Sequence, residues 1–228
     1  ALWPERWNLE MLNQRRLSMP AIQFSREYLC EPIHDVASMF PGPLLAKCRD
    51  PNLVLLDRAE TNYNEEGEPD GVFGQHFIGH DPAISSDKNA DFTAMTVMRQ
   101  KPEEPFKEVI HVVHERGMSS MAQKRMMVML NSRFQPELIE LEDMPIRIFM
   151  TTRAKKESLF MSLLLAFEQG NIKMPYGNEK SRKYTHEVET QLNRFGMQKS
   201  GRLESVGVHD DLAMSLALAN WATKEFKG

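Results

Sequence analysis

Acidic residues stand at the start or the end of apolar segments at several places in this sequence. Asp210 and Asp211 are adjacent and directly precede the apolar segment 212–219. Asp81 follows closely on the apolar segment 72–78. A charge in such a position is costly to bury unless another group compensates it. These carboxylates are therefore the first candidates for chemistry.

A third acidic group comprises Glu140, Glu142 and Asp143, in and directly after the short apolar segment 138–141. If the segments that carry Asp81 and Glu142 form neighbouring strands, and the last helix packs across them, all three groups converge. Clustered carboxylates repel each other, which raises their pKa values, so such a cluster needs cations. Mg²⁺ and Mn²⁺ are hard ions that prefer oxygen ligands. Two of them, about 3.5–4 Å apart, can hold a phosphodiester for in-line attack by water.

Each acidic group also has a purely structural interpretation. Asp210 and Asp211 can cap the backbone N–H groups at the start of a helix, where the helix dipole favours negative charge. Asp81 can belong to a turn, because Pro82 follows it. The acids around Glu142 can lie on a solvated strand edge. Only a fold that brings the groups together distinguishes these interpretations from a metal site.

Other catalytic chemistries lack their sequence signals. The chain has no glycine-rich phosphate-binding loop, so we expect no ATP site. It has no nucleophile-elbow pattern of the kind that serine hydrolases use. Its seven histidines do not show zinc-ligand spacing, and Cys30 and Cys48 show no metal-type pairing. The cysteine content fits a reduced, cytosolic setting.

Composition indicates the size and class of the protein. The 228 residues allow one domain or two small ones, and an apolar content of 41% suffices for a hydrophobic core. The net charge of −4 argues against a protein that coats nucleic acid through bulk attraction, but not against an enzyme that grips DNA locally. We expect no secretory signal and no membrane-spanning segment, because the longest apolar stretch, 163–167, is short.

The pattern of apolar residues predicts an α/β fold with a mixed β-sheet flanked by helices. Three apolar segments separated by turns predict an antiparallel meander. Apolar residues at helical spacing, together with capping residues, predict the helices. We expect strands at 72–78, 92–98, 109–113, 138–141 and 146–149, a short extended segment at 172–175, and helices at 120–131, 155–169, around 188–195 with its end at Gly196, and from Asp210 onward.

The N-terminal part of the chain differs in pattern from the rest. Residues 1–71 predict an extended, partly helical arm, with short helices around 9–17 and 22–29. The polar stretch 60–70 predicts an exposed loop. We therefore place the domain boundary in this region and expect the main domain to comprise residues 72–228.

Several segments of the chain, taken in order, resemble one known family. They are residues 79–83, 91–94, 135–142, 166–175 and 209–219. Together they resemble the nuclease domain of the large terminase subunit of tailed double-stranded DNA bacteriophages. Residues 3–7 and 24–28 resemble the segment that joins this domain to the family's packaging ATPase. The resemblance covers most of the chain, and several motifs in the right order are more specific than one.

The resemblance implies an RNase H-like fold and a metal-dependent endonuclease. Such an enzyme cuts concatemeric double-stranded viral DNA during genome packaging, by two-metal phosphodiester hydrolysis with Mg²⁺ or Mn²⁺. The partners it implies are double-stranded DNA and, in the full protein, a packaging ATPase domain, the portal and the small terminase subunit, with no membrane involved. The implied location is the host cytoplasm, where virus particles assemble. We expect no DNA translocation from this chain, because the ATPase half is missing from it.

The resemblance also assigns roles to residues by their position. Asp81 matches the acid on the first strand, and Glu142 matches the middle acid. Asp210 and Asp211 match the terminal pair, and Asp210 is the more direct metal ligand. One feature departs from the family, because Glu142 and Asp143 run almost directly into the next predicted strand, where the family usually has a helix. Glu140 and Asp143 therefore stay open as alternative middle ligands.

Further residues are candidates for supporting roles. Asp91 or Asp87 would assist a second metal ion, and Lys155 or Lys156 would contact the scissile phosphate. A solvated first helical turn is an equally good interpretation of these two lysines. The basic candidates for DNA binding near the C-terminus are Lys173, Lys180, Arg182, Lys183, Arg194, Lys199 and Arg202.

Two other functions stay open beside the terminase-type nuclease. One is another RNase H-like enzyme, such as a junction resolvase or an integrase, which would prefer branched DNA. The other is a non-catalytic module that docks the packaging motor on DNA or on the portal, which would tolerate loss of the acidic residues.

Overall fold

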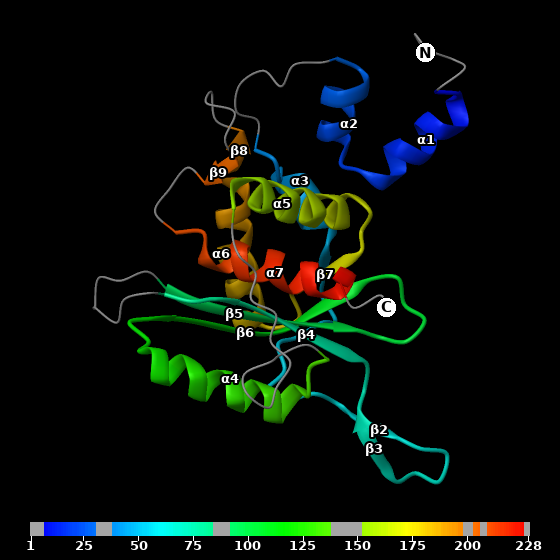
Figure 1. The fold of residues 1–228 in the computed structure, drawn as a ribbon. Coiled ribbons are helices and arrows are strands. Elements are labelled where there is room, and N and C mark those ends of the chain that lie inside the picture. Colours follow the sequence, from blue (N-terminus) through cyan, green and yellow to red (C-terminus); the bar gives the residue numbers. More distant parts are fainter. Residues whose placement is uncertain are drawn as a thin grey trace.

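The computed structural model describes residues 7–30, 38–83, 92–137, 152–197, 203–205 and 209–225 (Figure 1). The first part of the chain contains α1 (Leu9–Ser18), α2 (Ala21–Tyr28), α3 (Gly42–Lys47), β1 (Arg49–Asp50), β2 (Thr61–Tyr63) and β3 (Pro69–Val72). The rest contains β4 (Gln75–Asp81), β5 (Phe92–Gln100), β6 (Lys107–Arg116), α4 (Ser120–Phe134), α5 (Arg153–Glu168), β7 (Ile172–Pro175), α6 (Glu179–Asn193), β8 (Phe195–Met197), β9 (Leu203–Ser205) and α7 (Asp211–Glu225).

The main sheet has five described strands in the order β1-β7-β6-β5-β4. Strands β4, β5 and β6 form the predicted antiparallel meander, in which Asp81 is paired with Ala94 and Phe92 with Arg116. Strand β7 is parallel to β6, and β1 is parallel to β7. The expectation of a mixed sheet flanked by helices is confirmed.

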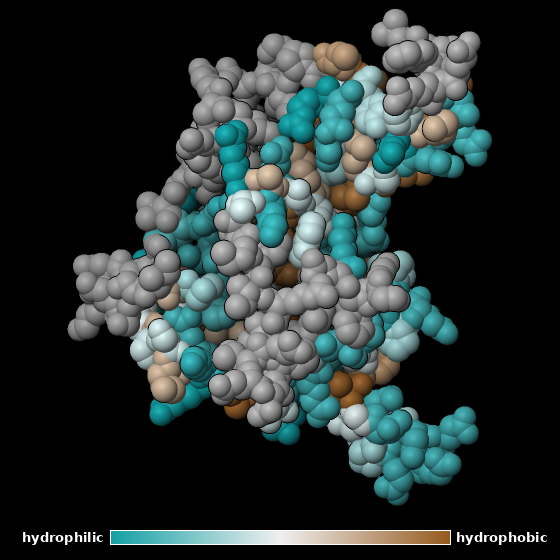
Figure 2. Space-filling model, in the orientation of Figure 1, coloured by the Kyte–Doolittle hydropathy of each residue, from teal (hydrophilic) through white to brown (hydrophobic). Residues whose placement is uncertain are grey.

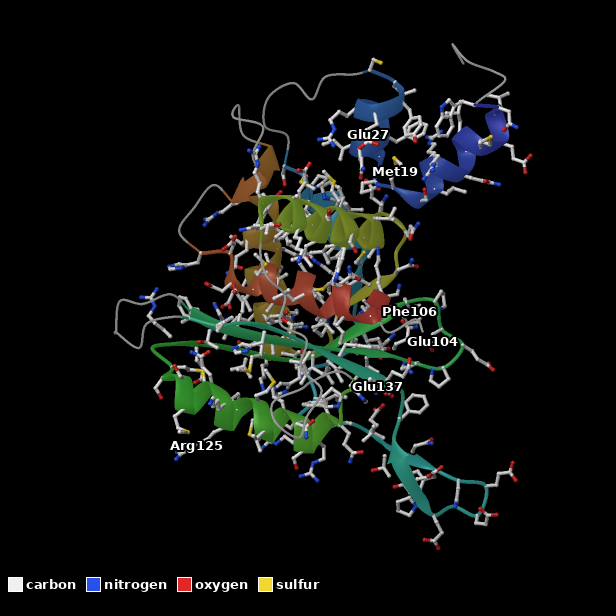
Figure 3. All side chains as sticks on the ribbon, in the orientation of Figure 1. Met19, Glu27, Glu104, Phe106, Arg125 and Glu137 are labelled. Carbon is white, nitrogen blue, oxygen red and sulfur yellow. The ribbon has the colours of Figure 1, made fainter. Side chains whose placement is uncertain are left out.

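Helices cover both faces of this sheet. Helices α5, α6 and α7 lie on one side and α4 lies on the other (Figure 1). Side chains of β5 alternate between the two layers: Ala94 and Met98 pack with α7, whereas Met95 and Val97 pack with α4. Figure 3 shows Arg125 on the outer face of α4, pointing away from the sheet. The molecule thus has two hydrophobic layers separated by one sheet.

Helix α7 lies exceptionally close to β4. A Cβ atom added at Gly79 would lie 2.0 Å from the carbonyl oxygen of Ser215 and 2.3 Å from the backbone nitrogen of Ala219. On the neighbouring strand, the Thr96 hydroxyl is 2.8 Å from the Ser215 hydroxyl. Most side chains of α7 between Asp211 and Thr223 are buried, so the helix is apolar around most of its circumference. Its position relative to β4 is therefore tightly constrained.

The two short helices expected in the N-terminal arm are confirmed as α1 and α2. The arm is attached to the end of α5: the Gln169 side chain donates to the Leu17 carbonyl at 2.9 Å, and the Ala21 N–H donates to Glu168 at 3.1 Å. Strand β1 belongs to the main sheet. The division into an arm of residues 1–71 and a domain of residues 72–228 stays a prediction.

Three local predictions differ from the structure. The stretch 60–70 was expected as an exposed loop and instead contributes to the β2–β3 hairpin, which projects as a hydrophilic extension (Figure 2). The following strand begins at Gln75 rather than at residue 72. The helix expected to include Phe195 ends at Asn193, and Gly196 lies in β8, where it pairs with Glu204. The strands expected at 138–141 and 146–149 lie outside the described residues.

Among the helices in the described part of the chain, none is both long enough and apolar enough to cross a membrane.

Gly79 offers a direct test of the contact between α7 and β4. We expect Gly79→Ala to lower the free energy of unfolding by about 3 kcal/mol or more, because the added methyl group would meet backbone atoms that cannot move independently. Gly42→Ala is the matched control, since nothing lies within 4 Å of a Cβ atom there. The control should stay within about 1 kcal/mol of the unchanged protein. Equilibrium urea unfolding measures both, and equal stability of the two variants would contradict the close contact.

His76 is a titratable group buried between the sheet and α4. It is fully buried, and its ring centroid lies 6.0 Å from that of Phe134. Neither ring nitrogen has a hydrogen-bond partner among the described residues. Burial, with a contribution from the Arg99 guanidinium, lowers the pKa of His76 to about 4. The folded protein therefore holds this imidazole in its neutral form.

The lowered pKa predicts that His76 makes the fold sensitive to acid. Between the folded pKa and the ordinary value of 6.5, the unfolded chain binds more protons than the folded one. The contribution of His76 to stability is complete above about pH 6.5 and declines as the pH falls toward 4. We expect a loss of about 3 kcal/mol through this group over that window, and a correspondingly smaller loss in His76→Phe. Urea unfolding at about pH 7 and about pH 5, between which about 2 kcal/mol of this loss falls, measures the difference. Identical pH dependence in both proteins would contradict the prediction.

Candidate active site

The start of α7 lies at the end of the sheet where β4 terminates. The His209 ring, two residues before α7, meets the Phe92 ring edge-on at a centroid distance of 5.4 Å. The Arg116 guanidinium lies over Phe92 at 4.4 Å and within 3.4 Å of the His209 ring nitrogen Nε2. Phe92 and Arg116 are paired across β5 and β6, and Asp81 is paired with Ala94, two residues from Phe92. Asp81 and the start of α7 therefore share one corner of the sheet.

The alternation of β4 places Asp81 on the face that α7 covers. Gly79 faces Ser215, and Asp81 lies two residues further along the strand on the same face. Asp211 lies one helical turn before Ser215. The step from Gly79 to Asp81 along the strand and the step from Ser215 back to Asp211 along the helix are each about 6 Å long. Both steps lead toward this corner. The sequence neighbours Asp210 and Asp211 are thereby brought beside the end of β4.

The carboxylates of this corner differ in exposure and in partners. Asp211 is only 7% exposed, and its Oδ2 lies 3.8 Å from Nδ1 of His209. Asp210 is partly exposed and forms an ion pair with Lys156, with 2.8 Å between the lysine Nζ and the carboxylate Oδ2. Lys156 belongs to the first turn of α5 (Arg153–Glu168). The corner therefore combines carboxylates from β4 and α7 with an ammonium group from α5.

Three helices begin at this end of the sheet. Helix α4 follows closely on the end of β6, α5 begins beside Asp210, and α7 begins at Asp211 (Figure 1). Helix N-termini carry partial positive charge and free backbone N–H groups, which stabilise carboxylates and attract phosphate. The electrostatic setting therefore suits both the clustered acids and an anionic ligand.

The chain directly after Asp81 is held from the opposite side of the sheet. The buried Gln123 of α4 donates from Nε2 to the carbonyl of Ala83 at 3.0 Å and to that of Met118 at 3.1 Å. The Ala83 N–H donates to the Thr93 hydroxyl at 3.3 Å. His80 lies next to this contact: burial lowers its pKa, and a hydrogen bond with Gln123 opposes the shift. The backbone around Asp81 is thus fixed on both faces.

The structure places part of the predicted site near one end of the sheet. Asp210 is paired with Lys156, Asp211 starts α7, and Asp81 ends the strand on which α7 packs. Lys155 is exposed in the first turn of α5, where its N–H donates to the Thr152 hydroxyl. Among the described residues, no three acidic, histidine or cysteine side chains form a complete metal-binding cluster. The predicted residues outside the described ranges are Asp87, Asp91, Glu140, Glu142, Asp143, Lys199 and Arg202.

Arg182 and Lys183 do not lie at this corner. They are exposed near the start of α6 (Glu179–Asn193). It is the later part of α6 that approaches the corner, since the Gln191 side chain accepts a hydrogen bond from the Ala213 N–H at 3.0 Å. These two residues stay predictions for DNA binding, without a described link to the carboxylates.

Sequence reasoning missed three residues of the corner. Arg116 ends a strand, and His209 adjoins the acidic pair, so both were visible as neighbours of candidate residues. The sequence Ser120-Met121-Ala122-Gln123 matches a capping box, which would use Gln123 to cap the start of the helix. In the structure Ser119 is the N-cap residue, and the Gln123 side chain turns inward to the chain after Asp81. Nothing in the local pattern distinguishes this use of a glutamine from helix capping.

Glu137, the last described residue before position 138, lies beside β4. The N–H of Glu137 donates to the carbonyl of His76 at 3.0 Å, and Figure 3 labels Glu137 near this strand. His76 lies on the strand that ends in Asp81. The segment predicted to carry the middle acid therefore starts beside the strand that carries the first acid.

Solved structures of large terminase nucleases share this fold. The large terminase nuclease of thermophilic phage G20c matches with a TM-score of 0.54 and 18% sequence identity, over 81% of this chain and 97% of that chain. The corresponding domain of Thermus phage P74-26 matches with a TM-score of 0.52 and 18% identity, over 80% and 93%. The large terminase of a further thermophilic bacteriophage, in complex with ADP, matches with a TM-score of 0.59 and 7% identity, over 98% of this chain and 53% of that chain.

No family model and no curated protein sequence matches the chain. The identities to the solved structures are low, so the likeness concerns the fold. The chain has the RNase H-like fold of large terminase nuclease domains, and the fold expected from the sequence resemblance is confirmed.

Gln123 provides a test of how the end of β4 is held. We expect Gln123→Leu to lower the free energy of unfolding by about 1–3 kcal/mol, because two carbonyl groups would lose their buried donor. Lys124→Leu, at the neighbouring exposed position, should change it by no more than about 0.5 kcal/mol. Urea unfolding of both variants measures the effect, and an unchanged Gln123 variant would show that the hydrogen bonds to Ala83 and Met118 add no stability.

Proposed function

We propose that this chain is a divalent-metal-dependent DNA endonuclease that cuts concatemeric double-stranded viral DNA during genome packaging. The observation that carries the proposal is the packing of α7, which starts at Asp211, against β4, which ends in Asp81, within this particular fold. The strand end and the helix start are far apart in sequence, so their proximity is a property of the fold rather than of local capping. The likeness to terminase nuclease domains supports the same conclusion.

The donor set at the corner fits hard divalent cations. It consists of carboxylate oxygens, which Mg²⁺ and Mn²⁺ prefer, and it includes a nearly buried acid, Asp211. Structures of the G20c nuclease have been solved with bound magnesium and with bound cobalt. We propose that Asp81, Asp210 and Asp211 hold such an ion here.

Additional ligands are proposed from the part of the chain outside the described ranges. Glu142 would be the middle acid, with Glu140 and Asp143 as alternatives, and Asp91 would assist a second ion. A bound pair of divalent ions supplies polarisation of the phosphodiester and an activated water molecule.

The protein's own groups have complementary tasks at the corner. The first turns of α4, α5 and α7 present backbone N–H groups and partial positive charge to a DNA phosphate. Arg116 and Lys155 add full positive charges that neutralise backbone phosphates independently of sequence. Gln123 keeps the chain after Asp81 in place, so that the carboxylate does not have to be ordered when DNA binds. This arrangement favours binding to any DNA sequence and suits cutting with little sequence preference.

The partners follow from the same proposal. The ADP complex is formed by a large terminase of which this chain matches about half. We propose that the nuclease acts with a packaging ATPase domain, the portal and the small terminase subunit, in the host cytoplasm. Double-stranded DNA is its substrate.

A plasmid cleavage assay tests the nuclease. With Mg²⁺ or Mn²⁺, we expect nicking and linearisation of supercoiled plasmid, which EDTA abolishes. Asp81→Asn and Asp210→Asn should each lower the cleavage rate about 100-fold or more, because each removes a charged metal ligand. Asp70→Asn, on the projecting β2–β3 hairpin, is the matched control and should cleave at the normal rate.

Two other results would overturn the proposal in different ways. A strong preference for branched over linear duplex DNA would indicate a junction resolvase or an integrase. DNA binding without cleavage, insensitive to metal and to both substitutions, would indicate a module that only docks the motor.

A further inference from the structure

Lys156 occupies one of the oxygen atoms that the proposed metal site needs. Its ammonium lies 2.8 Å from Oδ2 of Asp210, which makes this a charge-assisted hydrogen bond of ordinary length. The two side chains are 27% and 30% exposed, so water screens the pair only in part. In the absence of metal, the carboxylate of Asp210 is therefore already neutralised by a group of the protein itself.

Two aromatic side chains of the adjacent hydrophobic core hold the Lys156 side chain in place. Its ammonium lies 5.6 Å from the ring centre of Phe195 and 6.0 Å from that of Phe160. The two rings are fully buried and stack on each other with 4.1 Å between their centroids. Aromatic faces at this distance attract a cation. The backbone N–H of Lys156 donates to the Thr152 carbonyl at 2.8 Å, which fixes the start of the side chain in the first turn of α5.

An ammonium group and a metal ion cannot share the same carboxylate oxygen without strong repulsion. The ammonium of a released lysine can only donate hydrogen bonds, so it needs an acceptor, and an anionic one also compensates its charge. The proposed substrate supplies one, since a phosphate bound at the helix N-termini of this corner would lie next to the start of α5.

We propose that Lys156 is the resident counter-ion of Asp210, which a divalent metal ion displaces, and that the released ammonium then contacts the DNA phosphate. This inference rests on the proposed nuclease function and concerns the control of its metal site. Lys156 would lower the affinity for metal in the free protein and raise the rate of cleavage once metal and DNA are bound. The two effects have opposite signs, which a side chain that merely supports the local structure would not produce.

Calorimetric titration of Mn²⁺ into the full chain without DNA tests the first effect. We expect Lys156→Met to bind Mn²⁺ on the order of 5- to 10-fold more tightly than the unchanged protein, because the competing charge is gone. Lys156→Arg keeps the positive charge and should stay within about twofold of the unchanged protein. Lys124→Met, an equal loss of charge on α4, should leave Mn²⁺ binding unchanged. Lys156→Gln serves as a second neutral variant if the methionine variant does not fold.

Plasmid cleavage over a range of Mn²⁺ concentrations tests the second effect. For Lys156→Met we expect half-maximal cleavage at a lower Mn²⁺ concentration and a maximal rate reduced about 10-fold, because the phosphate loses its cation. Unchanged or weaker Mn²⁺ binding by both neutral variants would overturn the exchange at Asp210. An unreduced maximal rate would overturn the transfer of Lys156 to the phosphate. Because the calorimetry contains no DNA, Mn²⁺ binding without any plasmid cleavage would contradict the nuclease while the titrations still decide the exchange.

Discussion

Helix α7 rests on β4 at a distance that only a glycine permits. The backbone of Ser215 and Ala219 occupies the space in which any side chain at position 79 would lie. The rest of the helix is held by burial, since Leu212, Leu216 and their neighbours are fully enclosed between the sheet and the helices α5 and α6. Burying each such leucine contributes roughly 1.5–3 kcal/mol. The contact between α7 and β4 fixes the position of the start of the helix relative to the end of the strand. The arrangement of the candidate site depends on this relative position.

Backbone packing decides where the acidic residues at this end of the sheet lie. Asp211 is nearly buried and Asp210 precedes it, so the packing of α7 on β4 sets the position of both relative to the end of β4. The positive ends of helix dipoles and the ammonium of Lys156 offset part of this charge. A ligand that binds the folded state alone would offset more of it and stabilise the fold by mass action. Tightly packed carboxylates beside the positive ends of helices are what our proposal assigns to a cation site.

The parts of the fold predicted from sequence are those with a strong periodic pattern. The meander of β4, β5 and β6 and the last helix were recognisable because their apolar residues fill one layer or the other. The β2–β3 hairpin was not, because its polar strands have no buried face to create a pattern. The end of α6 was missed because Phe195 continues the helical spacing while its backbone has already become extended. In both cases the structure depends on hydrogen bonds between strands, β2 with β3 and β8 with β9. The spacing of apolar residues along the sequence does not indicate such pairing.

Three of the acids proposed for the site stand out in the sequence, whereas the residues that pack against them do not. Asp81 and the pair at 210 and 211 stand out because charge interrupts apolar sequence. By contrast, Gly79 and Gln123 are ordinary residue types whose roles depend on what packs against them, on opposite faces of the same strand. The ion pair of Lys156 joins two helices whose starts are 58 positions apart (211 minus 153), so no local pattern reveals it.

Positions in this fold differ in how well they tolerate substitution. Core positions accept other apolar residues when the total volume is kept, which allows this fold to persist at 17–18% identity to solved terminase nucleases. Position 79 has no such freedom, because the obstacle is backbone rather than side chain. The end of β4 is therefore held by a steric limit from the α7 side and by directed hydrogen bonds from the α4 side. A change on either face would displace Asp81 relative to α7 while leaving its own chemistry intact, so the geometry of the corner depends on residues that take no part in binding a metal ion or DNA.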